Sequence, residues 1–193
     1  MKKLIILPLL LITALTLKSN AQDQPAAEKY GKTLNLGAGI GYYGHVGHTI
    51  PVAMLNYEFD VAKNFTLAPF IGFYSYTNYY YWGNPDKPNY DPSYRQYSYR
   101  ETVIPVGVKG TYYFDQLLHA NSKWDFYASG SLGFVFRKAV WENGYYGDQH
   151  VYNSASPLYL NVHVGAEYHM TQKMGLFLDL SSGVSTFGLA IHF

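Results

Sequence analysis

Eight ionisable side chains occur at alternate positions of otherwise apolar segments, where proton transfer or ion pairing is the available chemistry. Carboxylates can act as general acids or bases, histidine changes charge near neutral pH, and lysine or arginine can pair with a carboxylate. Side chains of a strand alternate between two faces, so each of these groups shares its face with small or polar neighbours. The set comprises Glu58, Glu101, Lys109, Asp125, Arg137, His163, Glu167 and Asp179.

The charges of this set predict a self-satisfied polar network rather than a catalytic centre. Pairing segments 99–114 and 124–137 about a turn near His119 places Glu101 opposite Arg137, and we expect an ion pair there. We expect Lys109 to meet an acid of another strand, with Glu167 or Glu58 as candidates. The set holds more acids than bases, so His163 and His169 are expected to share protons with the surplus acids.

Alternating segments of strand character carry all of these residues. Apolar side chains recur at every second position of each segment, which is the period of a β-strand. The eight segments are 32–42, 52–59, 65–76, 99–114, 124–137, 158–169, 174–182 and 187–193. Most are long enough to cross a bilayer at a tilt, which takes about 9–11 residues.

The two faces of these segments differ sharply. One face collects nearly all of the Leu, Ile, Val and Phe residues, and the other collects the ionisable set together with Gly, Ala and Ser. A barrel of eight strands has a narrow interior, which bulky residues from every strand would overfill. Only lipid can solvate an exterior of this kind. The sequence therefore predicts an all-β, eight-stranded, antiparallel, up-and-down transmembrane β-barrel, whereas a soluble barrel would have the faces reversed.

The amino-terminal region has the pattern of an export signal. Lys2 and Lys3 precede an apolar stretch, and small residues lead to a predicted cleavage site near Ala21. We therefore expect a signal peptide at 1–21, a flexible lead-in at 22–31 and the barrel at 32–193. The formal net charge is +1, and loss of the leader lysines leaves a slightly acidic chain, which disfavours a nucleic-acid partner. The chain has no cysteine and so no disulfide.

The final segment carries an aromatic pattern at its end. Phe187, Leu189, Ile191 and Phe193 share one face of this segment. Such an ending resembles the signal that the barrel-assembly machinery reads in bacterial outer-membrane barrels. It predicts an outer-membrane location, with outer-membrane lipid around the exterior and the assembly machinery as a partner during biogenesis.

Two stretches carry a family resemblance, VIPVGVKGTYYF at 103–114 and FGLAIHF at 187–193. Together with the export signal they resemble the outer-membrane β-barrel (porin-like) family common in Bacteroidota. The resemblance implies a barrel like the small OmpA and OmpX types and supplies no catalytic residues. Pro51, Pro69 and Pro105 depart from an ideal barrel, and each is expected to mark a bulge or a strand start, because proline removes a ladder donor.

Aromatic residues gather in the second long connection, 77–98, which we expect on the extracellular side with 138–157. One interpretation is an aromatic girdle on strands that continue beyond the membrane. The other is a recognition surface for an extracellular protein or glycan, because tyrosine offers large contact area at low entropic cost. The recognition candidates are Tyr79, Tyr80, Tyr81, Trp82, Tyr90, Tyr94 and Tyr97.

Catalytic and metal motifs are weak in this chain. His45 and His48 would need a third ligand from elsewhere, so we expect no metal site and no cofactor. The sequence holds no G-x-S-x-G, H-E-x-x-H or P-loop pattern, and Ser129 and His163 point inward, away from lipid substrates. We therefore expect a non-enzymatic barrel with a structural or surface-interaction role and a plugged lumen. The alternative function is a narrow porin-like channel for small solutes.

Overall fold

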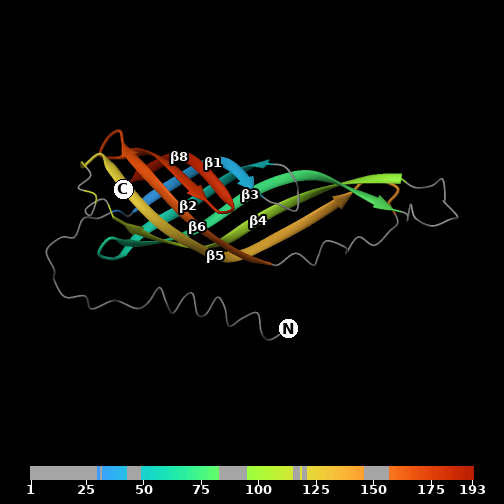
Figure 1. Ribbon diagram of the computed structural model, residues 1–193, viewed down its shortest axis with the longest axis horizontal. Helices are drawn as coiled ribbons and strands as arrows, with labels where there is room; N and C mark the ends of the chain where they lie inside the picture. Colours follow the sequence, from blue (N-terminus) through green and yellow to red (C-terminus); the bar gives the residue numbers. More distant parts are fainter. Residues whose placement is uncertain are drawn as a thin grey trace, which may run out of the picture.

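The computed structural model describes residues 30, 32–42, 49–82, 95–114, 118, 121–145 and 157–193. Eight antiparallel strands follow one another around a closed barrel, and β8 pairs with β1 to complete it (Figure 1). This confirms the predicted all-β fold. The strands are β1 (Thr33–Tyr42), β2 (Thr49–Ala62), β3 (Phe65–Trp82), β4 (Arg95–Tyr113), β5 (Trp124–Trp141), β6 (Leu158–His169), β7 (Met174–Ser181) and β8 (Val184–His192).

Some of the sequence predictions concern residues that the structure does not describe. The signal peptide and nearly all of the lead-in lie outside the described residues, as do His45 and His48. In the part of the chain that is described, no helix is long and apolar enough to span a membrane.

The two ends of the barrel differ in their connections. Thr33, which begins β1, pairs with His192, which ends β8, at the same end as the tight β2–β3 turn and the short β6–β7 connection. Asn64 in the β2–β3 turn has φ of 57°, a left-handed conformation that asparagine tolerates in tight turns. We call this end the turn end and the opposite one the loop end.

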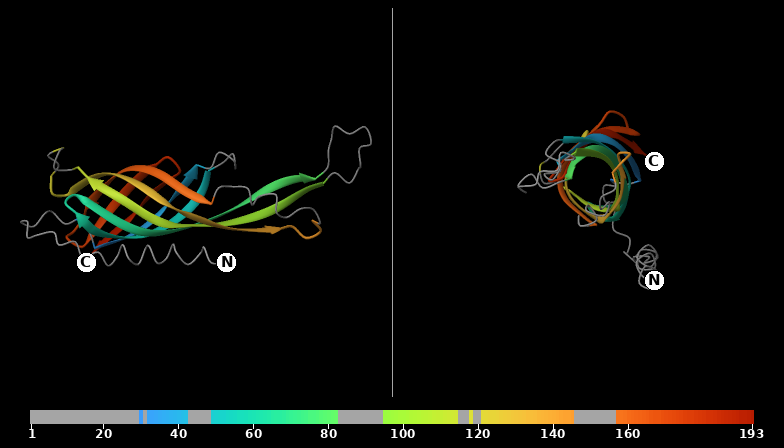
Figure 2. Two further views of the ribbon diagram at one scale, coloured as in Figure 1. Left: turned by 90° about the horizontal axis from the view of Figure 1, so that it is seen from below. Right: turned by 90° about the vertical axis from the view of Figure 1, so that its right-hand side faces the viewer.

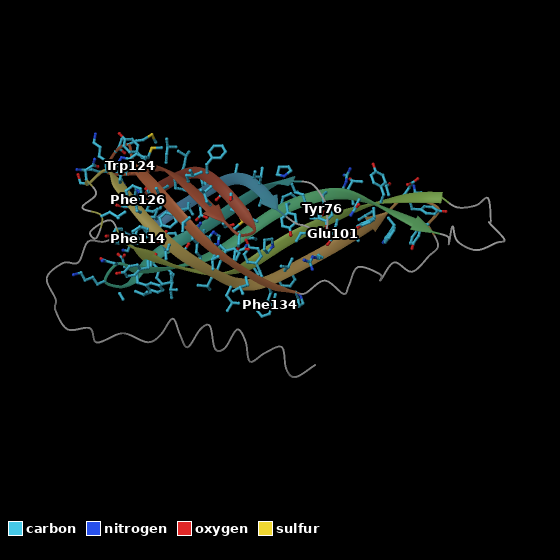
Figure 3. All side chains as sticks on the ribbon, in the orientation of Figure 1. Tyr76, Glu101, Phe114, Trp124, Phe126 and Phe134 are labelled. Carbon is cyan, nitrogen blue, oxygen red and sulfur yellow. The ribbon has the colours of Figure 1, made fainter. Side chains whose placement is uncertain are left out.

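The side chains divide between exterior and interior as the alternation predicts. Bulky apolar residues project outward from every strand; Leu160 is 68% exposed, and Phe134 visibly points away from the ring (Figure 3). The ionisable residues point inward, and Glu58, Glu101, Glu167 and Asp179 are buried. The outward face thus forms an apolar belt around the polar interior.

The interior is less uniformly polar than the sequence predicts. Near the loop end, Ile50, Val52, Val103 and Val184 are buried inside the barrel with two tyrosines, Tyr74 and Tyr76. These six residues form what we call the apolar cluster. The interior is apolar at this level because β2, β4 and β8 contribute aliphatic side chains there, and a narrow interior can still accommodate a single layer of them.

β3, β4 and β5 run well past the rest of the ring at the loop end (Figure 2). Pairing between β3 and β4 continues to Trp82 and Arg95, and pairing between β4 and β5 reaches Tyr99 and Trp141. Strand pairing of β2 with β3 ends at Phe73, and that of β6 with β5 ends at Phe134. We call this three-stranded part the extension. The strands therefore continue into parts of the two predicted connections, 77–82 and 95–98 of the first and 138–141 of the second, as one of the two interpretations expected for 77–98. The predicted segments are too short at 76, 99 and 137, because Tyr-rich segments retain strand propensity beyond the apolar belt.

The prolines are accommodated differently from the prediction. Pro51 is the third residue of β2, as a strand-start position requires. Pro69 and Pro105 lie within the ladders of β3 and β4 without any register shift, so the bulges expected there do not form. The irregularity in β2 falls instead between Asp60 and Ala62. Each proline within a strand lacks one backbone N–H and so removes only one hydrogen bond of the sheet, a loss that a closed barrel tolerates.

The position of the apolar belt can be tested by inserting a charge at two outward positions. We expect Val164→Arg, at an outward position in the middle of β6 that is 58% exposed, to lower the free energy of unfolding by about 2–4 kcal/mol, the cost of arginine near the bilayer midplane. Val140→Arg, which replaces a residue 57% exposed on the extension, should cost about 0–1 kcal/mol. The measurement is urea unfolding from liposomes, and equal costs at both positions would contradict this placement of the belt.

Candidate functional site

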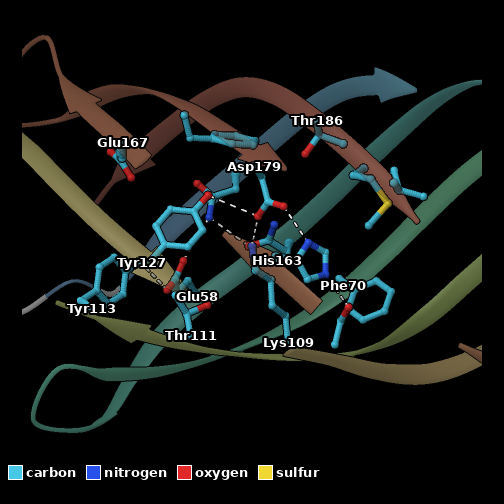
Figure 4. A pocket seen from close by; sticks show the side chains of 16 residues that line it. Glu58, Phe70, Lys109, Thr111, Tyr113, Tyr127, His163, Glu167, Asp179 and Thr186 are labelled. Atoms are coloured by element: carbon cyan, nitrogen blue, oxygen red, sulfur yellow. Dashed lines mark hydrogen bonds and ion pairs between the residues drawn. The ribbon is translucent and has the colours of Figure 1, made fainter. Parts of the chain in front are cut away.

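A small cavity lies inside the barrel, surrounded by side chains from every strand (Figure 4). Its volume is about 40 Å³, which is room for only a few water molecules. Of the predicted set, Glu58, Lys109, His163, Glu167 and Asp179 line it. The other three members lie nearer the ends of the barrel.

Asp179 of β7 is the centre of the polar network. Its Oδ1 lies 2.6 Å from His163 Nδ1 of β6, and its Oδ2 accepts hydrogen bonds from Lys109 Nζ of β4 and, at 3.3 Å, from the Tyr127 hydroxyl of β5 (Figure 4). Tyr127 reaches this position because its ring covers Gly165, where an added Cβ would fall 2.3 Å from the ring. One carboxylate therefore joins four strands across the lumen.

The partner predicted for Lys109 is wrong. We expected Glu167 or Glu58, and the ion pair forms with Asp179 instead. Glu58 of β2 is satisfied by neutral donors: the Thr66 hydroxyl, the Tyr113 hydroxyl at 2.6 Å and Asn35 Nδ2 at 3.2 Å. Hydroxyl and amide donors can thus hold a buried carboxylate without a cation.

The predicted ion pair between Glu101 and Arg137 forms, although the register differs. Arg137 Nε lies 3.3 Å from Glu101 Oε1, but Glu101 is directly opposite Ala139 and Arg137 is opposite Val103. The long arginine side chain spans this two-residue diagonal offset. Glu101 also accepts a 2.6 Å hydrogen bond from the Tyr76 hydroxyl, and the two residues lie together where the extension leaves the ring (Figure 3).

The two histidines predicted to share protons with acids both do contact carboxylates. His163 meets Asp179, and His169 Nε2 lies 2.7 Å from Asp125 Oδ2. A third histidine, His192 of β8, was not expected in the network, and its Nε2 lies 2.7 Å from Glu167 Oε1. Its inward position was readable from the alternation of β8, but its contact with β6 was not.

A serine–histidine–aspartate chain runs through the network. Ser131 Oγ lies 2.7 Å from His163 Nε2, and the other ring nitrogen contacts Asp179. Ser129, the serine weighed from the sequence, is directly opposite His163, but the contact is made by Ser131. This order of contacts is the one that activates a serine nucleophile. All three residues are buried beside a cavity of about 40 Å³, which is too small for an acyl substrate.

The aromatic candidates are only partly described. Tyr79, Tyr80, Tyr81 and Trp82 belong to β3, and Tyr97 belongs to β4, so these five lie on strands of the extension rather than in a loop. Tyr90 and Tyr94 lie outside the described residues. Tyr79 is 56% exposed.

A stacked group of rings covers the other side of the extension. Tyr97 contacts Tyr145 at 5.1 Å between ring centroids, Tyr99 contacts Trp141 at 4.9 Å, and Trp141 stacks on Tyr145 at 4.2 Å. We call these four residues the aromatic group.

The residues of the terminal strand lie on the exterior. Phe187, Leu189 and Phe193 are exposed and Ile191 is half-buried. β8 pairs with β1 from Val184 to His192, so this strand closes the ring.

Comparison with known proteins gives the same architecture. The crystal structure of Neisserial surface protein A matches 83% of this chain and 95% of its own length, with a TM-score of 0.50 and 14% identity. A de novo designed transmembrane β-barrel matches 85% of this chain and 98% of its own, at 0.47 and 11%. Yersinia pestis Ail, crystallised with the heparin analogue sucrose octasulfate, matches 83% and 95%, at 0.46 and 7%. No protein-family model and no curated protein sequence matches the chain.

The closed ring, the apolar belt and the likeness to Neisserial surface protein A together define the class. The chain is an eight-stranded antiparallel transmembrane β-barrel. At this level of identity the likeness shows the fold, and the site has to be argued from its own residues.

The role of Asp179 can be tested with a double-mutant cycle. We expect Asp179→Asn to lower the free energy of unfolding by about 3–5 kcal/mol, because it leaves Lys109 as a buried charge without its carboxylate. Adding Lys109→Met should recover part of that loss, since the unpaired charge is then gone. The measurement is guanidinium unfolding in detergent, with Glu142→Gln at the loop end as a mild control. Additive losses in the double variant would contradict the pairing.

The serine–histidine–aspartate chain gives a second test. We expect a fluorophosphonate probe to leave Ser131 unmodified in the folded barrel, because the probe cannot enter a cavity of about 40 Å³. Mass spectrometry of the intact protein reads the result, and Ser131→Ala is the control for background labelling. Labelling that depends on Ser131 and on folding would overturn this and indicate an accessible nucleophile.

Proposed function

We propose that this chain is an outer-membrane barrel that acts through its surface, with the extension as the contact region and the lumen closed to transport. The observation that carries the proposal is the extension itself. β3, β4 and β5 continue past the strand pairing of the ring at the loop end, while β6, β7 and β8 end near it. A rigid ring that holds a projecting sheet is suited to presenting a binding surface.

Two features of the interior support a closed lumen. The apolar cluster fills the barrel near the loop end, and Ile50 and Val103 within it are 1% exposed. Between the apolar cluster and the turn end, Asp179 joins residues of four strands across the interior. The remaining cavity of about 40 Å³ offers little room for a hydrated solute. These contacts favour a plug over the alternative of a narrow porin-like channel.

The composition of the extension supports recognition of another macromolecule. Tyr79 is exposed on one side together with Arg100 and Lys138, and the aromatic group lies on the other. Tyrosine and arginine are enriched in binding hot spots, because they combine apolar area with hydrogen-bonding groups. Proteins and glycans are both ligands of suitable chemistry. No enzymatic role, cofactor or nucleic-acid partner is part of the proposal.

The outer membrane is the proposed location. The apolar belt requires lipid, and the structural likeness is to a Neisserial surface protein. Export through a leader cleaved near Ala21, insertion by the barrel-assembly machinery through the outward residues of β8, and membership of the Bacteroidota porin-like family belong to the same proposal. In this orientation the turn end faces the periplasm and the loop end faces outside.

A binding experiment tests the surface role. Liposomes containing the purified barrel are applied to a printed glycan array and to immobilised mucin and collagen. For any ligand bound, we expect Tyr79→Ala with Tyr97→Ala to weaken binding roughly tenfold or more, since truncating a hot-spot residue costs about 2 kcal/mol. Tyr112→Ala removes an exposed ring at the turn end and should leave binding unchanged.

Planar-bilayer recordings separate this function from the channel alternative. We expect the inserted protein to give no conductance above the bare bilayer. Stable conductance steps together with unaltered binding in the tyrosine variants would replace the proposed function with a pore.

A further inference from the structure

We propose that Glu167, His169 and His192 form a binding site for a divalent transition metal, with Zn²⁺ as the best-fitting ion, at the turn end of the barrel. One ligand atom from each residue lies within 4.8 Å of the other two. The three come from two strands, because His169 ends β6, Glu167 precedes it on the same inward face, and His192 ends β8. This site does not depend on the proposed surface role.

The strand between them makes room for the site. β7 separates β6 from β8, and its residue at this level is Gly175, which is opposite His169 on one side and Ala190 on the other. A Cβ on Gly175 would lie 2.0 Å from Glu167 Oε1. The absence of a side chain there lets the Glu167 carboxylate reach past β7 to His192.

Hydrogen bonds to residues outside the site orient the imidazole rings of His192 and His169. Thr33 Oγ1 donates to the Tyr30 carbonyl at 3.1 Å, so its single proton is used, and it can only accept from His192 Nδ1 at 2.9 Å. That places a proton on Nδ1 and directs Nε2 toward Glu167 Oε1, 2.7 Å away. A metal ion would displace to solvent the proton shared between Nε2 and Glu167 Oε1, which leaves Nε2 the lone pair that a metal requires.

His169 is held in the matching way. Its Nε2 lies 2.7 Å from the Asp125 carboxylate, which can only accept when ionised, and its Nδ1 lies 3.7 Å from Glu167 Oε1. Each ring thus has one nitrogen hydrogen-bonded by an outer residue and the other directed at the same carboxylate oxygen. This is the arrangement that orients histidine ligands in metal sites.

Charge and donor type indicate the class of ion. Asp125 and Glu167 have histidines as their ion-pair partners among the described residues. A divalent cation bound to two neutral imidazoles would balance the two carboxylates inside the barrel. Two imidazoles with one carboxylate suit Zn²⁺ and do not suit Mg²⁺ or Ca²⁺, which prefer oxygen.

The spacing also fits this ion. Ligand distances of about 2.0–2.2 Å in a tetrahedral site separate donor atoms by roughly 3.3–3.6 Å. The two observed separations from Glu167 Oε1, 2.7 and 3.7 Å, fall on either side of that range, and the two histidine nitrogens lie within 4.8 Å of each other, so small side-chain rotations are needed to close the site. The side chains of His169 and His192 are 23% and 19% exposed, so an ion can enter from the turn end and keep a water as its fourth ligand. Bound there, it would join β6 to the closing strand β8.

Zn²⁺ titration of the folded barrel tests the site. The mature chain is purified without a histidine tag, stripped with EDTA, exchanged into metal-free detergent buffer and titrated with Zn²⁺ by calorimetry. The chain has no cysteine, so thiolate binding cannot contribute. We expect one Zn²⁺ per chain, with affinity lowered about 10–100-fold by Asp125→Asn and by at least as much in His169→Ala, His192→Ala and Glu167→Gln.

Two controls distinguish this site from other histidines. His163→Asn alters an imidazole of the Asp179 network and should retain Zn²⁺ affinity, as should the double variant His45→Ala with His48→Ala. A second measurement covers variants that fold poorly: Co²⁺ added to the wild-type barrel should give the visible absorption bands of a four-coordinate site, which one equivalent of Zn²⁺ removes. Absence of Zn²⁺ binding in the wild-type protein, or binding lost only in the His45 and His48 variant, would overturn the proposal.

Discussion

Ionisable groups inside a narrow ring of eight strands have to be paired with a charge or hydrogen-bonded by other groups in the same ring, because hydrocarbon surrounds the outside. The barrel meets this constraint with carboxylates that each contact several strands. Asp179 receives donors from β4, β5 and β6, and Glu58 receives donors from β1, β3 and β4. A buried carboxylate without such partners would cost several kcal/mol by general estimates, about 3–5 when one member of a buried pair is removed. The same contacts that satisfy charge therefore connect strands that do not pair in the sheet.

The same contacts between strands limit the space that is available for chemistry inside the barrel. Ser131, His163 and Asp179 stand in the order of a catalytic relay, yet Asp179 is shared with Lys109 and Tyr127, and the adjacent cavity holds only a few waters. The relay geometry here is a consequence of satisfying buried polar atoms. Transport and catalysis both need space, and the network leaves a cavity of about 40 Å³. The proposed contacts with other molecules and with a metal ion are therefore at the two ends of the barrel. The extension projects at one end, and Glu167 with its two histidines lies at the other.

Sequence reasoning succeeded where the relevant contact was local. The assignment of side chains to the two faces of each strand is correct because it needs only the two-residue alternation. The ion pair of Glu101 with Arg137 could be predicted because both residues lie on one hairpin. Its register was off by two residues, since the connection 114–123 is too long to define the hairpin centre. Continuing strands were one interpretation of the tyrosine-rich region, but their ends could not be defined, since the apolar alternation stops near residue 76 while pairing of β3 with β4 continues among tyrosines to Trp82.

The sequence by itself determined the number and approximate position of the strands and which side chains face inward, because these follow from the alternation of neighbours along the chain. Only the tertiary structure decided which acid meets which base. Lys109 contacts Asp179, which lies 70 residues later in the chain, and Glu167 contacts His192 past Gly175. These contacts form because ring closure and strand stagger bring the strands that carry them to facing positions. A lumen contact depends on the curvature of the whole sheet, and no local pattern records that curvature.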